Sequence, residues 1–98
     1  MIFVLVTMTE AEGQLEALQQ YKTTATQVRD EYGAKVVSRY EVGERLVGGF
    51  ADTSVRLLAF DSEEQVKGWL SDERYVEVIP LRERAFRSVT VSVLHSLD

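Results

Sequence analysis

The side chain most often used for acid–base chemistry occurs once in this sequence, at His95. An imidazole changes its protonation near neutral pH, so His95 is a candidate catalytic base. It alternates with the residues before it, Val89, Val91 and Val93, as the last position of a predicted strand. A histidine at a strand end is more often hydrogen-bonded or solvated than catalytic. We therefore favour a structural role and keep the catalytic one as the alternative.

Arginines form the second group of candidates. Arg39 lies in one alternating segment and Arg56 lies in the next. If these segments pair in the right register, Arg39, Glu41 and Arg56 form a charged row across a sheet. A partly buried guanidinium binds a carboxylate through two parallel hydrogen bonds, so Arg39 is a candidate ligand-binding residue. An exposed ladder of charges, or an ion pair at a dimer interface, explains the same pattern equally well.

Three further side chains are candidates. The segment Leu81–Arg87 holds three arginines, which usually indicates a solvated helix face. Arg82 directly follows Pro80-Leu81, which restricts its direction, and we predict that it binds a ligand. Trp69 falls at helical spacing, where an aromatic residue usually belongs to the core, although it could line a ligand pocket. Tyr40 offers a hydroxyl as a proton donor and is a second catalytic candidate, although nothing in the sequence would lower its pKa.

Composition argues against several classes of function. The 98 residues include no cysteine, which removes disulfides, thiolate nucleophiles and cysteine metal sites. The formal net charge of −5 argues against nucleic-acid binding, which needs a basic surface. No phosphate-binding loop, dinucleotide motif or histidine-based metal spacing is present, so we expect no cofactor and no metal. No apolar run approaches the roughly 20 residues that cross a bilayer, so we expect a cytoplasmic protein without membrane contact.

Hydrophobic periodicity predicts the elements that position these side chains. Four strands are predicted, at Ile2–Met8, Lys35–Val42, Ser54–Phe60 and Ser88–His95. Helices are predicted at Gln14–Tyr32, after an N-cap at Asp61 or Ser62, around Tyr75 until Pro80 interrupts it, and at Leu81–Phe86. Simple alternation in the second strand places Val36, Ser38 and Tyr40 on one face and Val37, Arg39 and Glu41 on the other.

The order β-α-β-β-α-β predicts a single α+β domain over residues 1–98 with a ferredoxin-like fold. Right-handed crossovers place the helices on one face of the antiparallel sheet. The strands at Ile2–Met8 and Ser54–Phe60 carry apolar residues at both parities, so the other face of the sheet also needs a cover. A second copy of the chain, packed sheet to sheet around a two-fold axis, is the simplest cover, and we expect a homodimer.

A set of motifs begins in the first third of the chain: Tyr32-Gly33 through Arg39, Leu57 to Phe60 with Asp61-Ser62, Trp69, Ser71-Asp72-Glu73-Arg74-Tyr75, and Pro80-Leu81-Arg82. Together they resemble a widespread, uncharacterised bacterial family in the dimeric α/β-barrel superfamily of ferredoxin-like folds. The resemblance implies a homodimer with a small pocket in each subunit between the sheet and the helices. It also implies that Arg39 and Arg82 are polar residues of that pocket. Relatives in the superfamily include cofactor-free monooxygenases, isomerases, haem-dependent enzymes and stress-response proteins.

Three hypotheses follow for function. The first is a homodimer that binds a small anionic organic molecule through Arg39 and Arg82, with Tyr40, Trp69 and His95 as further lining residues. The second is a cofactor-independent monooxygenase or isomerase that acts on an activated aromatic or a lactone, with His95 as the base and Arg39 as the cation. The third is a structural or regulatory dimer, in which side chains fill the space between helices and sheet.

Overall fold

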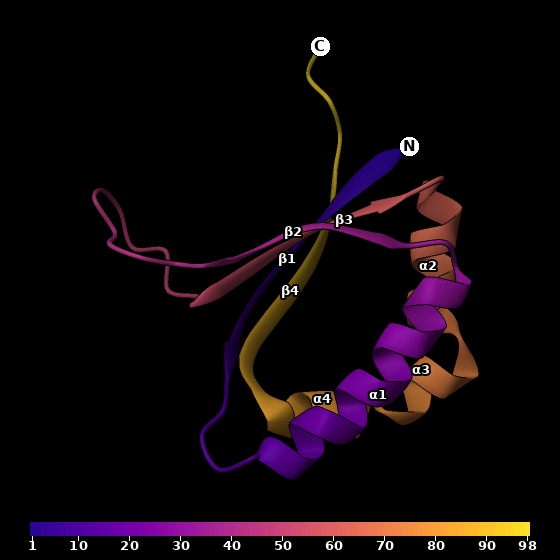
Figure 1. Cartoon of the computed structure of the whole chain (residues 1–98), viewed down its shortest axis with the longest axis horizontal. Coiled ribbons are helices and arrows are strands. Elements are labelled where there is room, and N and C mark those ends of the chain that lie inside the picture. The colour runs from indigo at the N-terminus through magenta and orange to yellow at the C-terminus, as the bar shows by residue number, and fades with distance from the viewer.

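The computed structural model describes all residues, 1–98, and consists of one sheet with every helix on the same side (Figure 1). The elements along the chain are β1 (Ile2–Glu10), α1 (Leu15–Glu31), β2 (Lys35–Glu41), β3 (Ser54–Phe60), α2 (Glu63–Ser71), α3 (Glu73–Glu77), α4 (Ile79–Ala85) and β4 (Phe86–Leu94). None of the helices is long and apolar enough to span a membrane.

The four strands form one antiparallel sheet in the order β2-β3-β1-β4. The central strand β1 pairs with β3 on one side and β4 on the other, so that Val4 lies between Leu58 and Val93. This strand order and the helices on one face confirm the predicted ferredoxin-like fold.

The core lies between the helices and the covered face of the sheet. Every second residue of β1 is buried there, beginning with Val4. The predicted apolar stripe of α1 packs onto these residues through buried side chains at helical spacing, including Leu18, Tyr21, Ala25 and Val28. Helix α2 begins at the predicted N-cap Ser62, which forms a capping box with Gln65. The apolar faces predicted from a period of two residues for strands and 3.6 residues for helices therefore pack against each other in one hydrophobic core.

The structure corrects the sequence analysis at three places. A bulge at Val37 shifts the register between Val36 and Ser38, so that Val36 lies on the same face as Arg39 and not on that of Ser38 and Tyr40. The break between α3 and α4 falls at Val78, and Pro80 lies in the first turn of α4, where its missing N–H costs nothing. Strand β4 begins at Phe86 and ends at Leu94, so His95 follows the strand.

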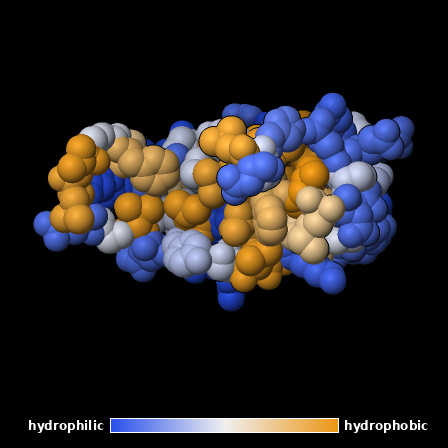
Figure 2. Space-filling model, turned by 90° about the horizontal axis from the view of Figure 1, so that it is seen from above, coloured by the Kyte–Doolittle hydropathy of each residue, from blue (hydrophilic) through white to orange (hydrophobic).

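The second face of the sheet carries no helix (Figure 1). Its central residues are hydrophobic: Leu5, Val55 and Leu57 are partly buried, and Phe3 is exposed. The connection between β2 and β3 projects away from the body (Figure 1), and it carries the exposed side chains of Leu46 and Val47. Seen from above, hydrophobic side chains gather over the middle of the molecule and at this projecting end (Figure 2). This apolar surface agrees with the expectation that the face needs a cover.

Candidate functional site

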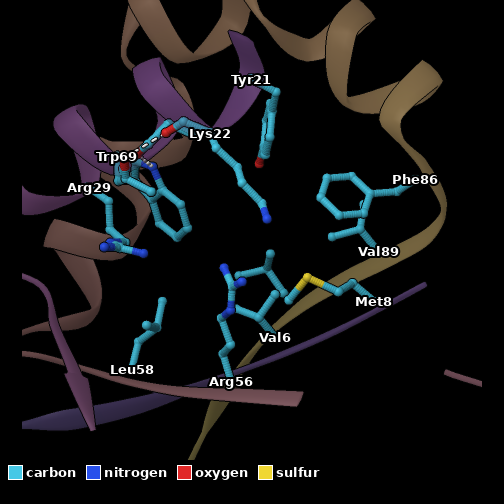
Figure 3. A pocket seen from close by; sticks show the side chains of 13 residues that line it. Val6, Met8, Tyr21, Lys22, Arg29, Arg56, Leu58, Trp69, Phe86 and Val89 are labelled. Carbon is cyan, nitrogen blue, oxygen red and sulfur yellow. Dashed lines mark hydrogen bonds between the residues drawn. The ribbon is translucent and has the colours of Figure 1, made fainter. Parts of the chain in front are cut away.

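A cavity of about 50 Å³ lies between α1 and the covered face of the sheet (Figure 3). A cavity of roughly 10–15 Å³ holds one water molecule, so this one has room for a small group of atoms. Nine of its 13 lining residues are hydrophobic. They come from the sheet, such as Val6 and Leu58, from α1, and from α2 through Trp69. The cavity is thus an apolar pocket inside the predicted space between helices and sheet.

Three positively charged side chains reach this apolar pocket, and no carboxylate lines it. Lys22 and Arg29 are two helical turns apart on α1, so they lie on one side of the helix. Arg56 rises from β3, and Figure 3 shows all three side chains pointing into the same space. The acidic partners of the α1 cations lie outside the lining: Lys22 Nζ is 3.6 Å from Glu10, and Arg29 Nε is 3.1 Å from Asp30. Two of the three pocket cations therefore already have an acidic partner.

Arg56 is the one pocket cation that forms no ion pair within the protein. No carboxylate lies within salt-bridge distance of its guanidinium. It is paired in the sheet with Val6 on one side and Arg39 on the other. Burial lowers the pKa of Arg56, and the charges of Arg39 and Arg29 lower it further. A guanidinium still keeps its proton at neutral pH, so Arg56 is a half-buried cation that an anion would stabilise.

A chain of hydrogen bonds leads from α4 to the pocket. The Nη1 group of Arg82 donates to the hydroxyl of Tyr75 over 3.1 Å, and that hydroxyl lies 2.9 Å from the hydroxyl of Tyr21. Tyr21 lines the pocket, whereas Tyr75 is fully buried. Burial, and to a lesser extent the neighbouring Tyr75, raises the pKa of Tyr21 far above its ordinary value. Tyr21 is therefore a neutral phenol at physiological pH and can donate a hydrogen bond.

Trp69 forms a rigid wall of the pocket. Its indole Nε1 donates to the backbone carbonyl of Ala25 over 3.1 Å, and its ring stacks on Phe60 with centroids 5.9 Å apart. The hydrogen bond satisfies the single polar group of the indole, which leaves a hydrophobic surface toward the pocket. Trp69 therefore belongs to the hydrophobic core and also lines the pocket, although the sequence analysis treats these two positions as alternatives.

The other predicted site residues do not line the pocket. Arg39 is the cross-strand neighbour of Arg56, and Arg82 is connected to the pocket through two tyrosines. Tyr40 lies on the opposite face of the sheet, because it pairs with Val55. His95 is highly exposed beyond β4, with its Nε2 atom 3.1 Å from Glu63.

His95 and Arg39 stand at opposite edges of the sheet. Strand β4 forms one edge and β2 the other, three strand spacings away. At about 4.8 Å per spacing, the two backbones are roughly 14 Å apart across the sheet alone. This distance does not favour a base and a cation acting on the same small substrate.

Lys22, Arg29 and Tyr21 are pocket residues that the sequence analysis does not select. In the sequence, the sign of these residues is their helical spacing. Residues 21, 22, 25, 26 and 29 fall on one side of α1, where two cations border the apolar stripe. A cation at the border of an apolar stripe is common on any helix, so the signal gains meaning only when the sheet places Arg56 opposite. No group of three or more histidine or acidic side chains is arranged to hold a metal ion.

Comparison with known proteins places the chain in a family. The model of the domain of unknown function DUF1330 matches residues 3–95, which is nearly the whole chain. This chain belongs to the DUF1330 family. The match confirms the expected membership in an uncharacterised family. No curated protein matches the DUF1330 chain in sequence.

Solved structures of low sequence identity share the fold of this DUF1330 protein. A protein of unknown function from Rhodopseudomonas palustris is 20% identical, with a TM-score of 0.82 over 99% of this chain and 82% of its own. A NIPSNAP domain protein from Burkholderia xenovorans is 16% identical, with a TM-score of 0.62 over 98% and 94%. A dimeric protein of unknown function with a ferredoxin-like fold from Bacteroides fragilis is 13% identical, with a TM-score of 0.58 over 97% and 95%.

Proposed function

We propose that this DUF1330 protein binds a small anionic organic molecule in the pocket between α1 and the sheet. The observation that carries the proposal is the convergence of Arg56, Arg29 and Lys22 on an apolar cavity that no carboxylate lines. The positive charge of Arg29 repels that of Arg56, and partial burial weakens the hydration of Arg56. An anion in the pocket would relieve both costs, because a guanidinium offers a carboxylate two parallel hydrogen bonds.

The size and lining of the pocket narrow the class of ligand. A volume of about 50 Å³ favours an anionic group attached to a short carbon chain. The valines of the sheet and the wall formed by Trp69 would contact that carbon chain. A strongly hydrated inorganic anion would gain nothing from these apolar contacts, so a small organic acid fits better.

We also propose that the protein acts as a homodimer through the open face of the sheet. The hydrophobic residues of that face, such as Leu5 and Leu57, support this proposal, as does the dimeric state of the Bacteroides fragilis neighbour. A second copy offers the same apolar surface around a two-fold axis, so each sheet would cover the other. The pocket lies on the helix side, and each subunit would therefore carry its own.

The test of the binding proposal is a calorimetric titration with short carboxylic acids, such as butanoate. We expect binding to the unmodified protein and a loss of at least tenfold in affinity for Arg56→Met, which keeps most of the side-chain length without the charge. Arg84→Met is the matched control, because Arg84 is exposed on α4 and does not line the pocket. Equal affinities for Arg56→Met and unmodified protein would contradict the proposal. We expect His95→Ala to bind as the unmodified protein does, in contrast to the base role of the enzyme hypothesis.

A further inference from the structure

The Tyr21–Tyr75 pair contains more hydrogen-bond donors than the protein can satisfy. Tyr75 is 1% exposed, and its oxygen accepts a hydrogen bond from Arg82. The one acceptor within reach of the Tyr75 proton is the oxygen of Tyr21, 2.9 Å away. If Tyr21 donated instead, the Tyr75 proton would be buried without a partner, which is costly. Hydrogen-bond satisfaction therefore sets the direction Arg82 to Tyr75 to Tyr21.

This direction leaves the proton of Tyr21 free to point into the pocket. Tyr21 is 9% exposed, and its hydroxyl has no protein partner other than Tyr75. In Figure 3 the side chain of Tyr21 points into the cavity from the α1 side, whereas Arg56 rises from the sheet. The cavity thus offers two kinds of recognition, a set of cations and a single neutral donor that is held in place by its neighbours.

From this arrangement we infer that the ligand is an acid with a second acceptor oxygen close to its carboxylate, as in a 2-oxo acid, and that Tyr21 donates to that oxygen. The inference rests on the proposed function and adds the chemical class of the ligand. The small volume of the cavity favours a short acid, in which a second acceptor oxygen lies close to the carboxylate. The positive charge on Arg82 polarises both hydroxyls in sequence and so strengthens the bond that Tyr21 donates.

The neutral state of the phenol agrees with a donor role. Burial raises the pKa of Tyr21, so the hydroxyl keeps its proton over the physiological pH range. A tyrosinate would instead accept a hydrogen bond and repel a carboxylate. Tyr21 therefore acts as a specificity-determining donor in this inference, and no proton leaves it.

Two probe acids that differ in one oxygen test this inference. Calorimetry compares 2-oxobutanoate with butanoate for the unmodified protein, Tyr21→Phe and the control Tyr32→Phe, whose hydroxyl bonds to Asp72 outside the pocket. One additional hydrogen bond is worth up to about a tenfold change in Kd. We expect the unmodified protein and Tyr32→Phe to prefer the oxo acid by about five- to tenfold. We expect Tyr21→Phe to bind both acids equally, within about twofold.

The possible outcomes separate this inference from the proposed function. Equal binding of the two acids by the unmodified protein, or a preference that survives in Tyr21→Phe, overturns the role of Tyr21 while the acid site stands. If neither acid binds, or if Arg56→Met binds both as well as the unmodified protein does, the proposed site fails and the inference fails with it. If Tyr21→Phe does not fold, the double variant Tyr21→Phe/Tyr75→Phe replaces it, because it leaves no buried phenol proton without an acceptor; Arg82, which loses the Tyr75 oxygen, still bonds to Glu83.

Discussion

Arg39 and Arg56 lie directly opposite each other in the register of β2 and β3, on the face of the sheet that carries the helices. Directly opposed like charges destabilise a sheet by roughly 0.2–1 kcal/mol. Neither arginine has a carboxylate within salt-bridge distance. In the proposed acid site, a bound anion would offset the repulsion between the two arginines.

Replacing Arg39 is therefore expected to stabilise the protein and weaken its binding of acids. In Arg39→Thr, a good strand residue takes the position and the repulsion of Arg56 disappears. A gain of about 0.5 kcal/mol corresponds to a rise in Tm of roughly 2–4 °C for a domain of this size. Scanning calorimetry at low and high salt measures the gain, which should shrink at high salt as screening weakens the repulsion. Arg87→Thr on β4 is the control, and an unchanged or lowered Tm for Arg39→Thr would contradict the prediction.

Gly68 in α2 packs against the ring of Tyr32 so closely that a methyl group does not fit. A Cβ atom at position 68 would lie 2.6 Å from Cε1 of Tyr32, whose hydroxyl donates to Asp72 over 3.0 Å. Although alanine is the better helix former by roughly 1 kcal/mol, we expect Gly68→Ala to destabilise the protein by about 1–3 kcal/mol. In a Tyr32→Ala background the same change should become stabilising. Urea unfolding of the four proteins measures both effects, and a destabilisation that is equal in the two backgrounds would exclude the Tyr32 contact as its cause.

Asp72 joins the end of α1 to α3 and makes stability depend on pH. Its carboxylate accepts bonds from the Arg74 side chain and backbone, and from Tyr32. The Arg74 bonds hold the pKa of Asp72 well below its ordinary value. Because the folded pKa is the lower one, this stabilisation is present above the unfolded pKa of about 3.9 and is lost as the pH falls below it.

We expect the Tm of Asp72→Asn to fall less than that of the unmodified protein when the pH is lowered from neutral to below about 4. Asparagine keeps the N-cap and removes the titrating charge. Asp61→Asn, which removes an exposed carboxylate outside any ion pair, is the control and should keep the original pH profile. Thermal unfolding by circular dichroism at several pH values measures the profiles. Parallel profiles for Asp72→Asn and the unmodified protein would show that Asp72 does not contribute the pH dependence.

The proposed dimer can be tested on the open face of the sheet. Leu57 lies opposite Leu5 near the middle of that face, so Leu57→Lys would place two charges in the two-fold interface. We expect sedimentation or native mass spectrometry to find a dimer for the unmodified protein and a monomer for the variant at micromolar concentration. Gln20→Lys, on the exposed surface of α1, should remain a dimer. A monomeric unmodified protein, or a dimeric Leu57→Lys, would leave the open face without this role.

Much of the fold is already determined by local patterns in the sequence. Alternation predicts β3 with its observed bounds, and the three- and four-residue steps predict α1 to within one residue at each end. The order of these elements, with right-handed crossovers, is enough to select a ferredoxin-like sheet. Val37 is the exception, because a bulge depends on how one strand pairs with its neighbour and not on alternation within the strand.

The site depends on contacts between residues that are far apart in the chain. The order of the elements along the chain is enough to place Arg39 and Arg56 on adjacent strands, but their direct opposition depends on the register of β2 and β3. Tyr21 and Tyr75 are 54 positions apart, and their hydroxyls meet because α1 and α3 pack on one face of the sheet. A local pattern specifies which face of an element is buried, whereas the partner across the core is specified by packing, which only the tertiary structure decides.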